Sequence, residues 1–242
     1  MSLPVILRDD FTSINLNKWE LFEQRSGTVI IEDGALRLLD NRTYNAGIYR
    51  LIEGIDTYPL EIEFTFRGWG TADGFTCIFY HDDGYDFGGG TKGFSGKGYG
   101  VMFDTYMNKR ISLNKDTYGN FLAYKNYTWA DQVWRHCLIT IYPENGRDRV
   151  KVYINDVEII SWLGTLDKTY DRFGFVSATG LSAMYAYIGY VEVRGGEWQP
   201  GFFAKVNGGW KQSNAYVKVN GSWRPVEAGW VKDNGVWKRL MG

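Results

Sequence analysis

The chain has 242 residues and a formal net charge of −1, so its charge balance gives no support for binding nucleic acid or an anionic membrane. Aromatic residues make up 17% of it, and 30 glycines stand against 5 prolines, which is typical of many short strands joined by glycine turns. It has no apolar stretch long enough to span a membrane, and its N-terminal segment MSLPVILRDDF has too short an apolar run for a signal peptide.

Alternating apolar and polar residues predict a series of short strands and no helix. After an opening strand and turn over 8–24, the expected strands cover 28–32, 35–39, 47–51, 60–67, 75–80, 99–103, 121–125, 134–142, 149–154, 157–161, 173–176 and 186–193. Turn dipeptides such as Asp33-Gly34 and Asn145-Gly146 separate several of them. Together these elements predict an all-β domain.

Two glutamates in the strand over 60–67 raise the question of a glycoside hydrolase, because Glu61 and Glu63 share one face. The run over 61–65 lacks the third acid and the middle aspartate of the glucanase motif that it would have to match. We therefore expect a solvated outer face there, and no enzyme.

The histidines and cysteines also give no catalytic constellation. The sequence contains no nucleophile-elbow motif that could pair with His81 or His136, and neither histidine has the spacing of a zinc ligand. Cys77 and Cys137 alternate with apolar residues, which favours buried free thiols; a disulfide between facing sheets is the less favoured alternative.

The stretch over 72–108 places a long glycine-rich loop between two predicted strands. Residues 81–98 hold seven glycines and no proline, and a loop of that length inside a compact domain is often functional. The next strand ends in Asp104-Thr105-Tyr106-Met107-Asn108. There a carboxylate, a backbone carbonyl and a side-chain amide recur at every second residue, a spacing that suits oxygen ligation of a hard cation such as calcium.

Four motifs in this order resemble those of the L-type lectins, the legume-lectin and concanavalin-like sandwich family. They are Ala72-Asp73-Gly74, Gly88-Gly89-Gly90, Phe103-Asp104-Thr105-Tyr106-Met107-Asn108 and Phe173-Gly174-Phe175-Val176-Ser177-Ala178-Thr179-Gly180. The resemblance covers roughly residues 8–194. It implies a carbohydrate-binding site in which Asp73 accepts hydrogen bonds from sugar hydroxyls, and a calcium site beside it.

The resemblance also assigns roles to other residues. The backbone NH of Gly89 or Gly90 would meet the same sugar, and Asn108 would touch it while binding calcium together with Asp104 and the Tyr106 carbonyl. An aromatic stacking face would come from Tyr106 or from Trp69, which could equally plug the rim of the core. The loop that tunes specificity in the family adds Leu181 and Ser182 as candidates.

The metal site departs from the family's pattern. The family usually has a glutamate two residues before the aspartate, where this chain has Met102. The loop that normally follows Asn108 and supplies a second aspartate and a histidine looks deleted, so the transition-metal half of the paired site is expected to be lost. The calcium half lacks one carboxylate, and Lys109 and Arg110 could replace the cation's charge outright. Calcium binding therefore stays open.

The C-terminal segment has a different character, with three similar units at 205–211, 218–224 and 232–238. Each predicts a strand, a type I′ Asn-Gly turn and a second strand. A small shared core around Trp210, Trp223 and Trp237 is favoured over a tryptophan-lined binding site. The unit resembles short repeats of bacteriophage tail and other virion proteins, which would reach the outside by cell lysis without a signal peptide.

The sequence thus predicts a concanavalin-like jelly-roll β-sandwich over 1–196 and a three-repeat β-hairpin module over 200–242. The expected function is non-catalytic binding of a host surface polysaccharide by a virion protein, a tail or capsid-exposed adhesin, with avidity supplied by homo-oligomers. The alternative is a structural decoration of the virion whose sugar site is inactive. Other virion proteins are expected as partners; nucleic acid and membranes are not.

Overall fold

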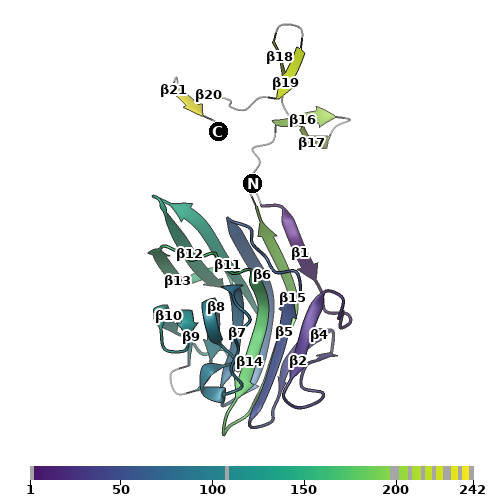
Figure 1. Ribbon diagram of the computed structural model, residues 1–242, viewed down its shortest axis with the longest axis vertical. Coiled ribbons are helices and arrows are strands. Elements are labelled where there is room, and N and C mark those ends of the chain that lie inside the picture. The colour runs from purple at the N-terminus through teal and green to yellow at the C-terminus, as the bar shows by residue number, and fades with distance from the viewer. Residues whose placement is uncertain are drawn as a thin grey trace. The chain divides into compact units, whose positions relative to one another are not determined.

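The computed structural model describes residues 3–106 and 109–196, together with the backbone of six short strands between residues 202 and 239. The chain forms two compact units, Met1–Glu197 and Trp198–Gly242. In the first unit, two antiparallel sheets lie face to face across an apolar core (Figure 1). This is the predicted jelly-roll β-sandwich.

The larger sheet has eight strands. Its spatial order is β13 (Val157–Gly164), β12 (Arg147–Ile154), β11 (Arg135–Glu144), β6 (Leu60–Gly70), β15 (Met184–Gly195), β4 (Ala35–Asp40) and β3 (Ile30–Glu32), and β1 (Val5–Asp9) also pairs with β15. Strict alternation along β6 sets its two faces, because Phe64 and Phe66 are fully buried in the core while Glu61 and Glu63 point outward.

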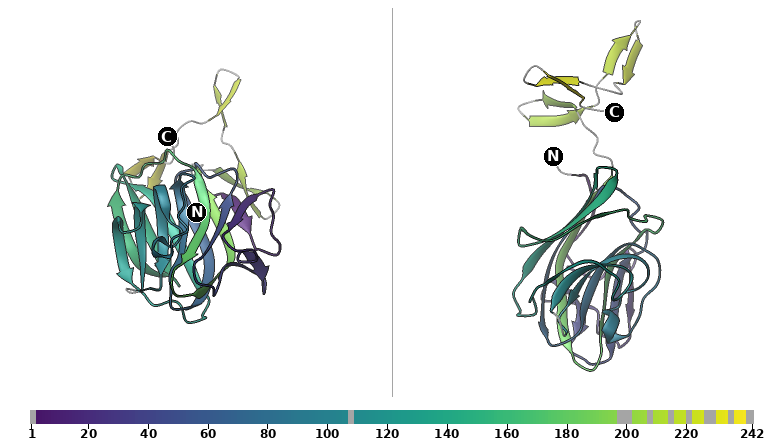
Figure 2. Two further views of the ribbon diagram at one scale, coloured as in Figure 1. Left: turned by 60° about the horizontal axis from the view of Figure 1, so that its bottom comes forward. Right: turned by 90° about the vertical axis from the view of Figure 1, so that its left-hand side faces the viewer.

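The second sheet has seven strands. Its spatial order is β10 (Phe121–Asn126), β9 (Arg110–Thr117), β8 (Ser95–Asp104), β7 (Gly74–His81), β14 (Arg172–Thr179), β5 (Asn45–Leu51) and β2 (Trp19–Glu23). Its central strands are buried along almost their whole length, so both faces of this sheet are covered. Figure 2 shows the two sheets as separate layers.

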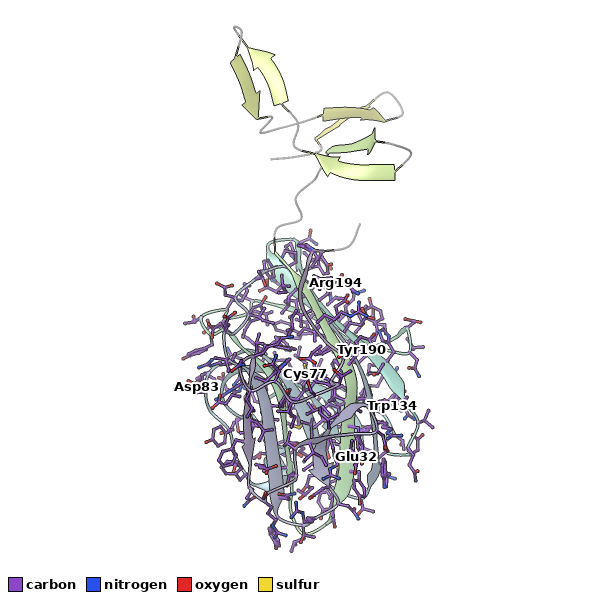
Figure 3. The ribbon with its side chains drawn as sticks, turned by 90° about the vertical axis from the view of Figure 1, so that its right-hand side faces the viewer. Glu32, Cys77, Asp83, Trp134, Tyr190 and Arg194 are labelled. Carbon is purple, nitrogen blue, oxygen red and sulfur yellow. The ribbon has the colours of Figure 1, made fainter. Side chains whose placement is uncertain are left out.

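Aromatic side chains from both sheets interlock in the core. The rings of Phe75 and Phe103 stack with their centroids 4.5 Å apart, and the Phe66 ring lies 4.7 Å from that of Phe103. Cys77 and Cys137 are buried free thiols, as predicted, and Cys77 lies between the layers (Figure 3). Burial raises the pKa of the Cys77 thiol, which keeps it unreactive in the folded protein.

Glu63 belongs to a paired network on the outer face of the eight-stranded sheet. Its carboxylate accepts hydrogen bonds from Tyr190 Oη at 2.7 Å and His136 Nε2 at 3.0 Å, and Arg194 lies 2.8 Å away. Burial alone would raise the pKa of Glu63, but these partners outweigh it and lower that pKa. The predicted outward direction of Glu61 and Glu63 is confirmed, but the two carboxylates are paired and mostly covered instead of solvated. Figure 3 shows Tyr190 and Arg194 along one side of the sandwich and Asp83 on the opposite side.

The second unit contains three β-hairpins. They pair β16 (Phe202–Val206) with β17 (Gly209–Ser213), β18 (Tyr216–Val219) with β19 (Ser222–Pro225), and β20 (Trp230–Asp233) with β21 (Val236–Arg239). The three strand pairs are the predicted hairpins, and the predicted Asn-Gly turns between their strands lie outside the described residues. The side chains of Trp210, Trp223 and Trp237 lie outside the described part of the chain. Among the residues that the structure does describe, no helix is long and apolar enough to cross a membrane.

Candidate functional site

The glycine-rich loop lies against the outer face of the seven-stranded sheet. Phe94, near its end, packs with Ile78, Met102 and Val176 in a second buried apolar cluster outside the main core. The short 3-10 helix η1 (Gly89–Thr91) sits against β14 in the same region. The loop therefore covers this part of the outer face.

Asp73 is fixed between two neighbouring loops. The backbone NH of Gly180 donates to its Oδ2 at 2.5 Å, and the backbone NH of Thr105 donates to its carbonyl oxygen at 2.9 Å. The Ala72–Asp73 peptide is cis, and Gly74 has φ of +154°, where a Cβ would lie 2.0 Å from the Phe103 carbonyl oxygen. Only glycine fits at that position, so the Asp-Gly pair of the motif has a direct steric reason.

One oxygen of the Asp73 carboxylate remains available to a ligand. Its Oδ1 accepts no hydrogen bond from residues 3–106 or 109–196, although the residue is only 4% exposed. Burial raises the pKa of Asp73, against the opposing effects of the Gly180 NH and the Lys92 charge. A carboxylate oxygen accepts hydrogen bonds, and a hydroxyl group of a ligand or of water can donate to it.

The other predicted sugar-site residues are exposed around Asp73. Leu181 and Ser182 follow Gly180, whose backbone NH bonds the Asp73 carboxylate. Leu181 is 81% exposed and Ser182 is partly exposed. Tyr106 is 43% exposed, and Gly90 has open space where a side chain would be. Asn108 lies outside the described residues. The loops that carry Asp73, Tyr106 and Gly180 thus meet at one rim through the hydrogen bonds of Asp73, and sugar binding by these residues stays a prediction.

Trp69 does not join this rim. Its side chain continues the outward-facing row of β6 and lies on the outer face of the eight-stranded sheet. There its ring stacks on that of Tyr187 with the centroids 5.3 Å apart, and the Tyr185 ring lies tilted against it at 4.6 Å. Trp69 was predicted either to stack on a sugar beside Asp73 or to plug the rim of the core. The structure instead places it in a row of aromatic side chains across neighbouring strands.

Asp104 ends β8 and is 1% exposed. Its Oδ1 accepts the backbone NH of Tyr106 at 2.8 Å, and its Oδ2 lies 3.5 Å from Lys92 Nζ and 3.7 Å from Arg110 Nε. Burial raises the pKa of Asp104, and the two cations and the Tyr106 NH oppose that rise. The sequence identified Arg110 as a replacement for the metal charge but missed Lys92, and Lys109 makes no ion pair with Asp104 among the described residues.

The described residues do not fit a calcium ion. Calcium takes about six or more oxygen ligands, whereas here both oxygens of Asp104 already have partners and two cations lie within 4 Å of it. The Tyr106 carbonyl, a second predicted ligand, accepts the backbone NH of Lys109 at 3.3 Å. No group of three acidic, histidine or cysteine residues able to hold a metal occurs in the described part of the chain.

A small cavity of about 120 Å³ lies beside the same turn, between Thr105, Lys109 and Trp129. Pockets that enclose a drug-sized ligand usually measure about 300–1,000 Å³. This one can take water or a single substituent of a ligand, so a bound sugar would rest mainly on the surface.

His81, where β7 meets the glycine-rich loop, makes folding depend on pH. Its ring is 1% exposed, and burial lowers its pKa from the ordinary value of 6.5, more than nearby Asp82 raises it. The unfolded chain therefore binds a proton near pH 6.5 that the folded chain does not. We expect stability to be full above that pH and to fall as the pH drops through it, by up to about 1.4 kcal/mol per pH unit.

Urea unfolding at several pH values measures this effect. His81→Leu should lose the share of the slope that His81 contributes, and identical slopes for the wild type and the variant would contradict the assignment.

No protein-family model and no curated protein sequence matches the chain. Its structure is nevertheless similar to solved lectin domains. The exoplasmic/lumenal domain of VIP36 in its Ca2+/Man3GlcNAc-bound form has a TM-score of 0.61 at 17% identity, and the match covers 76% of this chain and 86% of that one. The carbohydrate recognition domain of Emp46p in a metal-free form also gives 0.61 at 17%, covering 81% and 96%.

A plant protein gives the same result. Metal-free lectin I-B4 from Griffonia simplicifolia has a TM-score of 0.63 at 16% identity, covering 77% of this chain and 98% of that one. At sequence identities this low, the similarity shows a shared backbone fold and nothing more. In each case the match extends over most of both chains. The chain therefore has the jelly-roll fold of the L-type lectin domains.

Proposed function

We propose that this protein binds carbohydrate without catalysis, at the rim formed by Asp73, Gly90, Tyr106 and Leu181. The observation that carries the proposal is the Asp73 carboxylate, held at one oxygen by the Gly180 NH and without a described partner at the other. An ionised carboxylate only accepts hydrogen bonds, which suits the hydroxyl groups of a sugar. The likeness to VIP36 structures that contain mannose or Man3GlcNAc supports the same class of ligand.

The shape of the rim indicates how such binding would work. Leu181 and Tyr106 offer exposed apolar surface beside one buried acceptor, and the adjoining cavity is small. A site of this kind contacts few sugar atoms, so a single copy should bind weakly. Homo-oligomers of the chain would then supply avidity towards a repetitive host surface polysaccharide.

The C-terminal hairpins lead us to place this activity on a bacteriophage virion, as a tail or capsid-exposed adhesin. Two of the three units carry the pattern Lys-Val-Asn-Gly-x-Trp and the third has Lys-Asp-Asn-Gly-Val-Trp; this pattern resembles repeats of virion proteins. Three short hairpins in series follow the lectin-like unit. Other virion proteins would be the partners of this module.

A second candidate function is a structural virion component with an inactive sugar site. The burial of Asp73, at 4% exposure, favours it, because a ligand hydroxyl must reach a carboxylate that is nearly enclosed. In that case the rim would only decorate the surface or contact another virion protein.

A glycan array separates the two candidates. The multimerised wild type should bind a restricted set of glycans. Asp73→Asn should lower the affinity for them by about 10- to 150-fold, because one hydrogen bond to a charged acceptor is lost. Asp10→Asn serves as the matched control, because Asp10 is exposed and distant in sequence from the rim. No binding by the multimerised wild type would favour the structural role.

A further inference from the structure

Lys92 is 2% exposed although it lies in a glycine-rich loop. Its Nζ donates to the Gly90 carbonyl oxygen at 2.9 Å and lies 3.5 Å from Asp104 Oδ2. The same atom sits 4.2 Å from the centre of the Tyr118 ring, within range of a cation–π interaction. Lysine is rarely buried this fully unless it is paired, so these three contacts form a built cation site.

The stem of Lys92 also contacts the strand that follows Asp73. A Cβ added to Gly74 would lie 3.1 Å from Lys92 Cγ, and Thr76 Oγ1 donates to the Lys92 carbonyl oxygen at 3.4 Å. Lys92 therefore joins three segments: its side chain contacts the Gly90 carbonyl and Asp104 at the end of β8, and its backbone carbonyl accepts from Thr76 in β7. These are the segments whose arrangement creates the rim.

We propose that the Lys92 side chain is a built-in cation that positions the sugar-binding loops, in place of the calcium that the resemblance assigns to Asp104. Arg110, 3.7 Å from the same carboxylate, adds a second fixed positive charge. A cation attached to the chain cannot be removed by a chelator, so the arrangement of these loops should not depend on calcium. The proposal rests on the proposed function for the identity of the site, but its test requires no glycan.

The wild type provides the first arm of the test. We expect its melting temperature to be the same in excess EDTA and in millimolar calcium, and isothermal titration with calcium chloride to give no saturable heat. A calcium-dependent rise in melting temperature, or stoichiometric calcium binding, would overturn the proposal without recourse to any variant.

Substitutions of Lys92 provide the second arm. Lys92→Met keeps the apolar stem and removes the charge, which should lower the melting temperature by roughly 6–12 °C and raise amide exchange in residues 88–94. Lys92→Arg keeps a positive charge and should stay closer to the wild type. Lys97→Met is the matched control, since the Lys97 side chain is 63% exposed, and it should change neither readout.

Lys92→Asp distinguishes a cation site from mere packing. Position 92 has φ of +54°, a conformation that aspartate tolerates well, and the substitution places a second carboxylate in the site next to Asp104. Calcium should then recover part of the lost melting temperature in Lys92→Asp and none in Lys92→Met. An equal calcium response in the two variants, or unchanged stability and exchange in both, would overturn the proposal. A failed glycan array alongside the expected calcium results would refute the proposed function alone.

Discussion

Asp104→Asn is expected to lower the free energy of unfolding by about 3–5 kcal/mol, because it leaves the buried charges of Lys92 and Arg110 without their carboxylate. The ion pair itself need not stabilise the fold, since burial raises the pKa of Asp104 and so opposes its charged form. Removing one partner is nevertheless costly because the other stays desolvated. Urea unfolding at neutral pH measures the change.

A double-mutant cycle sharpens this prediction. Lys92→Met in the Asp104→Asn background should cost much less than Lys92→Met alone, since an apolar stem then faces an uncharged amide. Asp33→Asn, in an exposed turn, should change stability by no more than about 0.5 kcal/mol. Additive losses for Lys92 and Asp104 would show that the two side chains do not interact.

Phe103→Ala should destabilise the sandwich by about 3–5 kcal/mol, with a fall in melting temperature of roughly 6–20 °C. The Phe103 ring is fully buried and stacks on Phe75, with the Phe66 ring 4.7 Å away, so its removal leaves a cavity that two sheets must close. The backbone of Phe103 also packs on Gly74 and leads directly into Asp104. The core therefore supports the rim as well as the fold.

Leu16→Ala is the control for this loss of apolar volume, because Leu16 is 62% exposed. In thermal unfolding, Leu16→Ala should stay close to the wild type, so the melting temperatures of the two variants should differ by most of the fall expected for Phe103→Ala. Similar melting temperatures would mean that Phe103 is not central to the core.

Much of the architecture was predictable because alternation is strict where one face of a strand is buried. The strand over 60–67 is an example. The three C-terminal hairpins were predictable for another reason, the Asn-Gly pair in each repeat. The same alternation, continued from Glu61 to Trp69, places Trp69 on the outer face, a signal that the neighbouring glycines obscured. Strand β9 was missed although Ile111 and Leu113 alternate with Arg110, Ser112 and Asn114, because the segment was interpreted through the family's missing metal loop.

The candidate site was only partly predictable. Asp73, Leu181 and Ser182 were proposed from the resemblance, and the glycine after Asp73 has a structural reason in its close contact with Phe103. Lys92 gave no signal, because a lysine among glycines ordinarily indicates a solvated loop. Its burial depends on the loop packing through Phe94 onto Ile78 and Val176, a tertiary event with no local pattern.

The most direct measurement is a calorimetric titration of the best glycan from the array into the protein, once in excess EDTA and once in calcium. A rim organised by Lys92 around Asp73 predicts the same affinity in both buffers for the wild type, a loss of about 10-fold or more in Asp73→Asn, and no loss in Asp10→Asn. Binding that disappears in EDTA, or that persists undiminished in Asp73→Asn, would contradict it.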